Sequence, residues 1–249
     1  MKLPTEKTKI ATNNPKNLII FGLPKVGKTT LVSKLPKCLI VDLESGTDYV
    51  EAFSVKPKNY KDLFLLAKEL KDNPDQFEYI ALDTITALED LALPFANKLY
   101  RDTSMGKNWD ENENILKLPN GAGYLYQREA VQTIIGWFQK VVPNVILIGH
   151  VKETTMSEEA TEMNVKNLDI TGKLSRILPA NSDAIGYIYR NIEDGKVMIN
   201  FGDDSSVLTG ARMPHLSGKT LVLSEMNKET GEITSYWDRI YPDLNKNNE

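Results

Sequence analysis

The chain has 249 residues, of which 41% are hydrophobic and 26% are charged, and this balance excludes a disordered or fibrous protein. A formal net charge of −4 excludes a global basic field for nucleic acid, although basic residues gathered on one face remain compatible with it. The N-terminus resembles no signal peptide and no run approaches about 20 apolar residues, so we expect no membrane association and a cytoplasmic location.

The pattern along the chain predicts one domain over residues 16–242, with flexible polar segments at 1–15 and 243–249. Short apolar runs alternate with helical patterns, which favours an α/β fold with a mostly parallel central sheet flanked by helices. The runs that predict parallel strands lie at residues 18–21, 39–41, 79–82 and 145–148.

Two helices and a C-terminal extension complete the predicted elements. Apolar residues at helical spacing follow Asn59, a residue suited to an N-cap, and predict a crossover helix. A second helix is predicted over about 124–142, and the helical spacing of its aromatic residues favours a place in the core. Residues 152–172 are polar without periodicity, which predicts a loop or mobile segment. Strands of an antiparallel hairpin extension are predicted at 184–190, 197–201 and 221–223.

Residues 22–29 match the phosphate-loop pattern G-x-x-x-x-G-K-T, with an apolar strand before them and a helix after them. Gly22 and Gly27 allow the backbone to curl around phosphate and point its N–H groups inward. Lys28 is expected to reach the β- and γ-phosphates of ATP, and the Thr29 hydroxyl to help hold Mg²⁺. The predicted nucleotide-binding residues are Gly22, Leu23, Pro24, Lys25, Val26, Gly27, Lys28, Thr29 and Thr30.

Two predicted strands end in acidic residues, at the sheet edge where open α/β sheets bind ligands. Asp83 follows its strand in the manner of a Walker B aspartate that orients Mg²⁺ or its water, and the alternative is an exposed or capping carboxylate. Glu44 lies two residues beyond Asp42 and is the candidate for activating the attacking water. The alternative for Glu44 is a solvated glutamate in a turn.

His150 ends the fourth predicted strand, immediately before the polar segment. In this position it would contact the γ-phosphate and transmit its presence to the segment. A lone histidine is more often a structural hydrogen-bonding residue, so both interpretations stay open from spacing alone.

Taken in order, the phosphate loop, Glu44, Asp83 and His150 resemble the RecA-like recombinase ATPases, and especially their short phage-encoded, core-only members. The resemblance covers about residues 17–225. It implies that Glu44 activates water, that Asp83 serves Mg²⁺ and that His150 reports nucleotide state to a DNA-binding loop. Most recombinases carry glutamine where this chain has His150, whereas the histidine fits the core-only members.

The resemblance also implies partners, namely single-stranded DNA, further copies of the chain in a ring or filament, and a single-strand-binding protein. The matching DNA-contact segments are about 101–123 and 151–172. The second segment has a negative local charge, so oligomerisation or backbone contacts would supply much of the DNA affinity. A cation from a neighbouring subunit would complete the site, and the candidates are Lys173, Arg176, Arg190, Arg212 and Lys219.

The leading interpretation is therefore an ATPase, stimulated by DNA, that acts on single strands in recombination, annealing or repair, in the host cytoplasm if phage-encoded. One alternative is a nucleotide-dependent switch or assembly ATPase with a protein partner. A P-loop kinase is another, but it would need an arginine-bearing lid, and no arginine lies between His150 and Arg176. GTP is disfavoured because residues 83–86 lack the D-x-x-G switch and residues 97–100 lack the aspartate of N-K-x-D.

Overall fold

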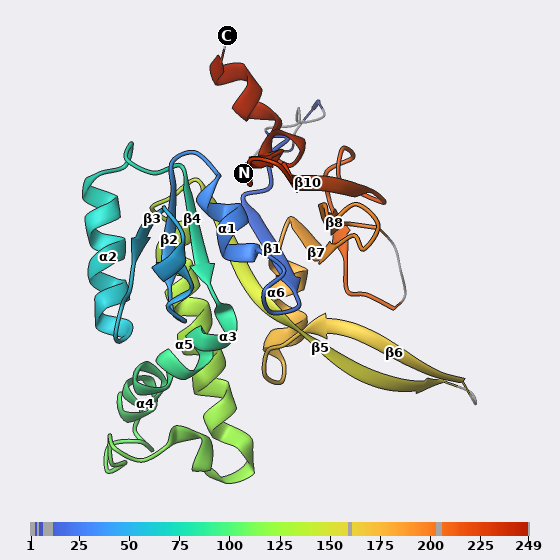
Figure 1. Ribbon diagram of the computed structural model, residues 1–249. Coiled ribbons are helices and arrows are strands. Elements are labelled where there is room, and N and C mark those ends of the chain that lie inside the picture. Colours follow the sequence, from blue (N-terminus) through green and yellow to red (C-terminus); the bar gives the residue numbers. More distant parts are fainter. Residues whose placement is uncertain (1–2, 4, 7–11, 159–160, 203–205, 249) are drawn as a thin grey trace.

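Residues 3, 5–6, 12–158, 161–202 and 206–248 are described by the computed structural model of the chain. Apolar runs form a parallel series of strands in the spatial order β3-β2-β4-β5-β1-β7 (Figure 1). The bounds of these strands are β1 (Asn17–Gly22), β2 (Cys38–Asp42), β3 (Phe53–Val55), β4 (Tyr79–Asp83), β5 (Asn144–Glu158) and β7 (Ala184–Arg190). The four strands predicted from apolar runs are thus confirmed.

Both faces of β1, β2 and β4 are buried, which explains why these strands are apolar almost without interruption. Alternate residues of β1 divide between two cores: Ile19 and Phe21 join one, and Leu18 and Ile20 join the other. The helices that pack in the first core include α2 (Tyr60–Asp72), α3 (Ile85–Leu91) and α5 (Ala122–Gln139), and residues of α4 (Leu93–Arg101) and α6 (Leu174–Asn181) join them. The second core lies under α1 (Lys28–Ser33) and the C-terminal 3-10 helix η4 (Trp237–Arg239).

The two predicted helices are confirmed. The Asn59 side chain accepts hydrogen bonds from the backbone N–H groups of Lys61 and Asp62 and so caps α2 as predicted. Helix α5 begins and ends two to three residues earlier than expected. The shorter helical elements had no clear signal in the sequence: η1 (Gly46–Tyr49), α4 (Leu93–Arg101), η2 (Ile115–Lys117), η3 (Pro119–Gly121), α6 (Leu174–Asn181) and η5 (Pro242–Asn248).

The predicted C-terminal extension is also confirmed. Strand β7 pairs antiparallel with β8 (Val197–Asn200), which pairs in turn with β10 (Thr220–Met226). Two short strands, β9 (Gly210–Ala211) and β11 (Ile233–Ser235), pair antiparallel with β7 and β10. The predicted fold class, a mostly parallel α/β sheet with an antiparallel extension, therefore holds. The flexibility expected of residues 1–15 and 243–249 stays a prediction.

The loop predicted over residues 152–172 is wrong. Strand β5 continues past the sheet and pairs antiparallel with β6 (Thr161–Leu168), from Val151 opposite Leu168 to Glu158 opposite Thr161. Figure 1 shows the two strands projecting from the body as a ribbon. Of the ribbon side chains that the structure describes, only Val165 and Leu168 at its base are buried, so the long run of alternating apolar residues that identifies a half-buried strand is missing here. Among the described residues, no helix is long and apolar enough to cross a membrane.

Candidate nucleotide site

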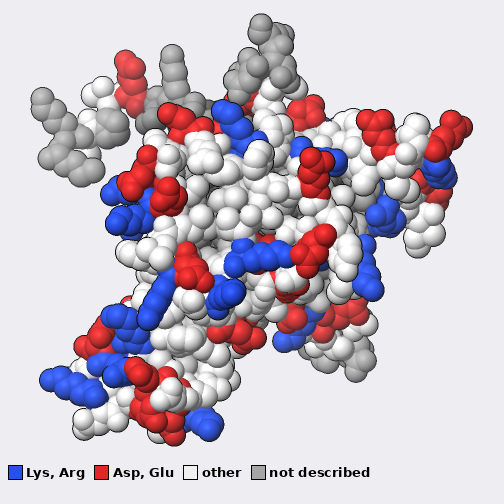
Figure 2. All heavy atoms as spheres, turned by 60° about the vertical axis from the view of Figure 1, so that its left-hand side comes forward, with Lys and Arg blue, Asp and Glu red and all other residues white. Residues whose placement is uncertain are grey.

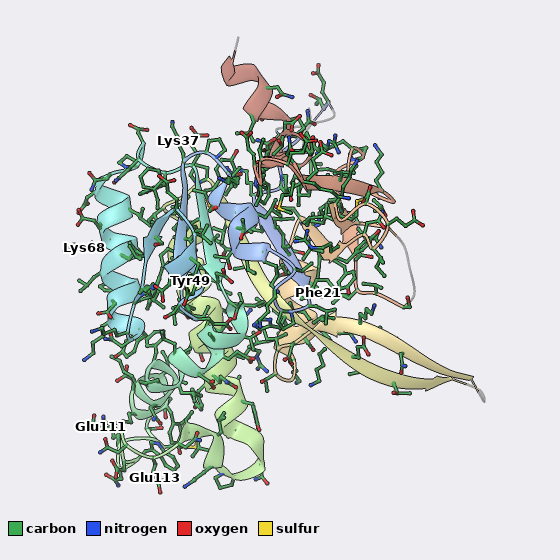
Figure 3. The ribbon with its side chains drawn as sticks, viewed as in Figure 1. Phe21, Lys37, Tyr49, Lys68, Glu111 and Glu113 are labelled. Carbon is green, nitrogen blue, oxygen red and sulfur yellow. The ribbon has the colours of Figure 1, made fainter. Side chains whose placement is uncertain are left out.

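Most of the predicted site residues meet at the carboxyl ends of the parallel strands, although Gly22, Leu23 and Val26 do not line the cavity found there. Strand register places Gly22 of β1 beside His150 of β5, and Asp42 of β2 beside Asp83 of β4. Phe21 and Tyr49, labelled in Figure 3, mark this end of the sheet. A cavity of about 400 Å³ opens here, lined by Pro24, Lys25, Gly27, Lys28, Thr29, Thr30, Glu44, Gly46, Tyr49, Val50, Asp83, Thr84 and His150.

The two loop glycines are required for different reasons. Gly27 has a φ of 105°, a left-handed conformation that strains any residue with a Cβ, and it directly precedes α1. A Cβ on Gly22 would lie 2.3 Å from the Ile188 carbonyl oxygen, so this glycine allows β1 to approach β7. The loop therefore turns into a helix N-terminus as expected for a phosphate cradle.

Lys28 folds back over the loop rather than pointing into solvent. Its Nζ donates to the carbonyl oxygens of Gly22 at 3.0 Å and Leu23 at 2.8 Å, and the residue is 7% exposed. Burial lowers the pKa of Lys28, and the negative charges of Asp83 and Glu44 oppose that shift. The two carbonyl oxygens are neutral, so they give this buried ammonium no negative charge to pair with. An anion bound in the cavity would supply that charge.

Thr29 and Asp83 form the oxygen pair predicted for Mg²⁺. Thr29 Oγ1 donates to Asp83 Oδ2 at 2.6 Å, although the two residues are 54 positions apart. Burial raises the pKa of Asp83, while the Thr29 hydrogen bond opposes the rise and the charge of Glu44 adds to it. One hydroxyl and one carboxylate suit Mg²⁺, which is commonly held by one or two carboxylates together with substrate phosphates. In the described part of the chain, no cluster of three or more His, Cys, Asp or Glu residues offers a metal site.

Asp42 and Glu44 share a strand end but have different roles. The Asp42 carboxylate accepts hydrogen bonds from the backbone N–H groups of Glu44, Gly46 and Thr47 and from the Thr47 hydroxyl. Burial alone would raise the pKa of Asp42, but these bonds outweigh it and hold the pKa below its usual value. Asp42 thus fixes the turn that directs Glu44 toward the cavity.

The Glu44 carboxylate is held by two side chains. Thr84 Oγ1 donates to Glu44 Oε1 at 2.6 Å, and His150 Nε2 lies 3.2 Å from both carboxylate oxygens. With the proton on Nε2, the imidazole donates to the carboxylate and leaves Nδ1 as an acceptor. His150 Nδ1 is buried and has no hydrogen-bond partner among the described residues. The structure therefore joins Glu44 and His150, which the sequence suggested as separate candidates.

Two of the five proposed trans-acting cations contact their own chain. The Arg190 guanidinium donates to the Gly195 carbonyl oxygen at 2.9 Å and lies 3.5 Å from the Val26 carbonyl oxygen of the phosphate loop. Arg212 pairs with Asp183 and donates to the Ala180 carbonyl oxygen. The role of a trans cation stays a prediction for all five.

Sequence reasoning missed four residues of the cavity wall: Gly46, Tyr49, Val50 and Thr84. The Tyr49 ring is 95% exposed although it lies beside the cavity, and an exposed large aromatic ring is an informative observation. Its signal in the sequence was an aromatic residue in a polar turn, five positions after Glu44. Thr84 gave no signal, because its importance comes from a hydrogen bond across 40 positions.

Within the described residues of the proposed DNA-contact segments, two of the basic side chains are paired with acidic or aromatic neighbours. Arg101 pairs with Glu111, and Lys166 lies 5.2 Å from the centre of the Tyr187 ring. Acidic and basic side chains alternate over the face drawn in Figure 2. Glu159 lies outside the described residues, as do the side chains of Glu158 and Glu162, so the negative charge predicted for the hairpin stays a prediction.

The chain is similar to a known family in sequence and to a known protein in structure. A family model described as an AAA domain matches residues 14–222. No sequence among the curated proteins matches the chain. Among solved structures, the chain is similar to the crystal structure of the RadB recombinase, with 16% sequence identity and a TM-score of 0.46, over 90% of this chain and 92% of that chain.

Proposed function

The chain belongs to the AAA domain family, and we propose that it is a RecA-like ATPase acting on single-stranded DNA in recombination, annealing or repair. One observation carries the ATPase part of this proposal. A phosphate loop with a buried lysine faces a hydroxyl–carboxylate pair and a second carboxylate across one cavity. These are the groups that phosphoryl transfer from a nucleoside triphosphate to water requires.

Phosphate binding is the task of the loop and α1. The backbone N–H groups from Gly27 to Thr30 lie at the helix N-terminus, where the helix dipole favours negative charge. Lys28 exchanges its two carbonyl partners for phosphate oxygens and stabilises the charge that develops during transfer. Thr29 and Asp83 would hold Mg²⁺, which would supply positive charge against the phosphates.

Water activation is the task of Glu44. The hydroxyl of Thr84 and the ring of His150 fix its carboxylate at the mouth of the cavity, so the carboxylate needs little reorganisation to accept a proton. Its neighbour Asp42 is unsuited to this role because four hydrogen bonds occupy its oxygens. A proton acceptor beside the cavity favours hydrolysis over transfer to a metabolite.

Base binding is the task of Tyr49. Its ring is exposed at the cavity rim, on the 3-10 helix that follows Glu44, where it can stack on a planar base. Stacking does not select adenine over guanine, but the absence of guanine-reading motifs favours ATP. Replacement of Tyr49 with alanine should weaken ATP binding by about tenfold, the scale of one base–aromatic stack.

The DNA part of the proposal rests on the resemblance in sequence and on the hairpin. Strand β5 carries His150 at the cavity and continues without a break into the projecting ribbon. A segment that begins at the nucleotide cavity and ends in solvent is suited to transmit the state of the nucleotide to bound single-stranded DNA. The mixed charges of the face drawn in Figure 2 favour several subunits acting together, since a single copy neutralises few phosphates there.

The proposal is tested by measuring ATP turnover and sedimentation of the full chain with and without single-stranded DNA. We expect DNA to accelerate turnover, and ATP with DNA to produce faster-sedimenting species. If DNA changes neither turnover nor sedimentation, the DNA part of the proposal is contradicted. That result would favour a nucleotide-dependent switch with a protein partner. Absence of ATP binding would contradict the whole proposal.

A further inference from the structure

Helix α3 lies between the nucleotide site and the base of the β5–β6 hairpin. Its N-cap is Thr84, whose Oγ1 accepts from the Ala87 N–H at 3.2 Å and donates to Glu44 at 2.6 Å. The hydroxyl that caps the helix therefore also donates a hydrogen bond to the Glu44 carboxylate at the cavity. A change of partner at Glu44 would act directly on the first turn of α3.

The same helix holds the chain where it leaves β6. Thr86 Oγ1 donates to the Asp169 carbonyl oxygen at 2.9 Å. One turn later, Glu89 accepts from the Thr171 N–H with both carboxylate oxygens at 3.0 Å and from the Thr171 hydroxyl at 3.2 Å. These bonds join residues more than 80 positions apart and fasten the end of the hairpin to α3.

Burying the carboxylate of Glu89 costs free energy that a purely structural position would not require. It is 5% exposed, and no lysine or arginine pairs with it in the part of the chain that the structure describes. Burial raises its pKa, the bonds from Thr171 oppose the rise, and the charges of Asp90 and Asp169 add to it. A buried carboxylate held only by one threonine is a junction that a small movement can weaken.

Close packing leaves the helix and hairpin little freedom to move separately. Leu168 lies so close to Gly149 that a Cβ there would be 2.4 Å from Leu168 Cδ1, and Ile85 of α3 would be 3.6 Å from the same Cβ. The Asp169 N–H donates to the His150 carbonyl oxygen at 2.9 Å. Interfaces packed this closely shift as units rather than deform continuously.

We propose that α3 carries the state of the nucleotide site to the β5–β6 hairpin, with Glu89 as the positioning residue that ties the helix to the hairpin. The route runs from Glu44 through Thr84 and α3 to Thr171, beside the direct path along β5. It rests on the proposed function, because it assumes nucleotide in the cavity. Linkage requires the reverse effect too, so a ligand on the hairpin would alter nucleotide affinity through the same helix.

The test is hydrogen exchange of peptides covering residues 164–172 in the full chain, with and without ATPγS and Mg²⁺. In the wild-type protein we expect bound ATPγS to change exchange at these amides by about tenfold, within the usual range of coupling between sites. In Glu89→Ala, ATPγS should bind with affinity within about threefold of wild type, yet the exchange response should fall well below tenfold, because only the Thr86 bond and the direct path along β5 remain. Glu89→Gln should restore part of the response, because its amide oxygen still accepts from the Thr171 N–H.

Matched variants separate coupling from simple loosening. Asp90→Ala, which removes an exposed carboxylate from the same helix, should keep the wild-type response. Thr86→Val removes the hydrogen bond to the Asp169 carbonyl oxygen and leaves Glu89 unchanged, so it should reduce the response. This variant replaces Glu89→Ala in the test if Glu89→Ala does not fold. A Glu89→Ala protein that exchanges faster overall but keeps the tenfold response would overturn the inference, as would a lost response in Asp90→Ala.

Calorimetry with ATPγS distinguishes this inference from the proposed function. Binding of ATPγS to the wild-type chain without any change in exchange at 164–172 would overturn the coupling and leave the ATPase proposal standing. Failure to bind would overturn both.

Discussion

The two halves of β5 occupy opposite environments. Residues 145–148 lie between β1 and β4 with side chains 0–6% exposed, whereas residues 151–158 form one edge of a projecting ribbon. Burial of apolar side chains specifies the first half, and hydrogen bonds to β6 specify the second. Elements with few buried contacts unfold locally at a lower free energy than core strands. Strand β5 therefore joins a region of high local stability to one of lower local stability. His150, where the halves meet, contacts the carboxylate that we assign to catalysis.

This contrast divides the expected effects of mutation. Changes at the buried end should affect nucleotide binding and turnover strongly, whereas changes along the ribbon should affect communication with a partner.

Lys28→Ala should abolish tight ATP–Mg²⁺ binding, a loss of about 1,000-fold in affinity, while the fold persists. In the free protein the lysine donates only to two loop carbonyls, so few other contacts depend on it. Calorimetry measures the affinity, and circular dichroism checks the fold. Lys34→Ala, an exposed lysine at the C-terminal end of α1, is the matched control. Unchanged affinity in folded Lys28→Ala would remove the phosphate loop from nucleotide binding.

His150→Ala should reduce turnover about tenfold with little change in ATP affinity, because it removes a donor from the Glu44 carboxylate. It should also reduce any acceleration by single-stranded DNA, since His150 joins the cavity to the ribbon. Steady-state rates with and without DNA measure both effects. Full DNA acceleration in the variant would show that the two halves of β5 communicate by another route, such as α3.

Gly149→Ala should destabilise the protein by about 1–3 kcal/mol, the usual cost of overpacking. The added methyl would collide with Leu168 of β6, where the ribbon joins the sheet. Gly136→Ala in α5 is the control, since no atom lies within 4 Å of its Cβ position and alanine favours helix. Urea unfolding of both variants gives the comparison. Equal stabilities would mean that the junction is looser than its geometry indicates.

Asp83→Asn should raise the stability of the nucleotide-free protein near neutral pH, which would appear as a higher Tm. Because the folded-state pKa of Asp83 lies above its unfolded value, the charged carboxylate destabilises the fold above that pKa. The advantage of the variant should therefore shrink as the pH falls through the raised pKa of Asp83. Thermal unfolding from pH 5 to 8 tests the sign. An advantage that grows on acidification would contradict the assignment.

Much of the buried half could be predicted from the sequence. Apolar runs give the strands, and the phosphate-loop pattern together with acidic strand ends gives Lys28, Thr29, Asp83 and Glu44. Each of these signals is local, because a buried parallel strand must be apolar and a phosphate loop must contain glycine. The ribbon could not be predicted in this way, since its pairing depends on backbone hydrogen bonds that any polar sequence can make.

The support around the site was equally hidden. Thr84, Glu89 and Thr171 are ordinary polar residues whose roles arise from hydrogen bonds across 40 to 82 positions. Nothing near them in the chain distinguishes them from surface residues. Only the topology, which brings α3 between β4 and the end of β6, places them in contact with distant residues.

The central claim is that Glu44 makes this cavity hydrolytic, and phosphate release from ATP by wild type and Glu44→Gln tests it most directly. Both proteins should bind ATP with similar affinity, because glutamine keeps the shape and accepts the Thr84 hydrogen bond. At saturating ATP and Mg²⁺, the variant should release phosphate about 100-fold more slowly, the usual scale for loss of a general base. Equal rates would contradict the assignment and place water activation on another residue.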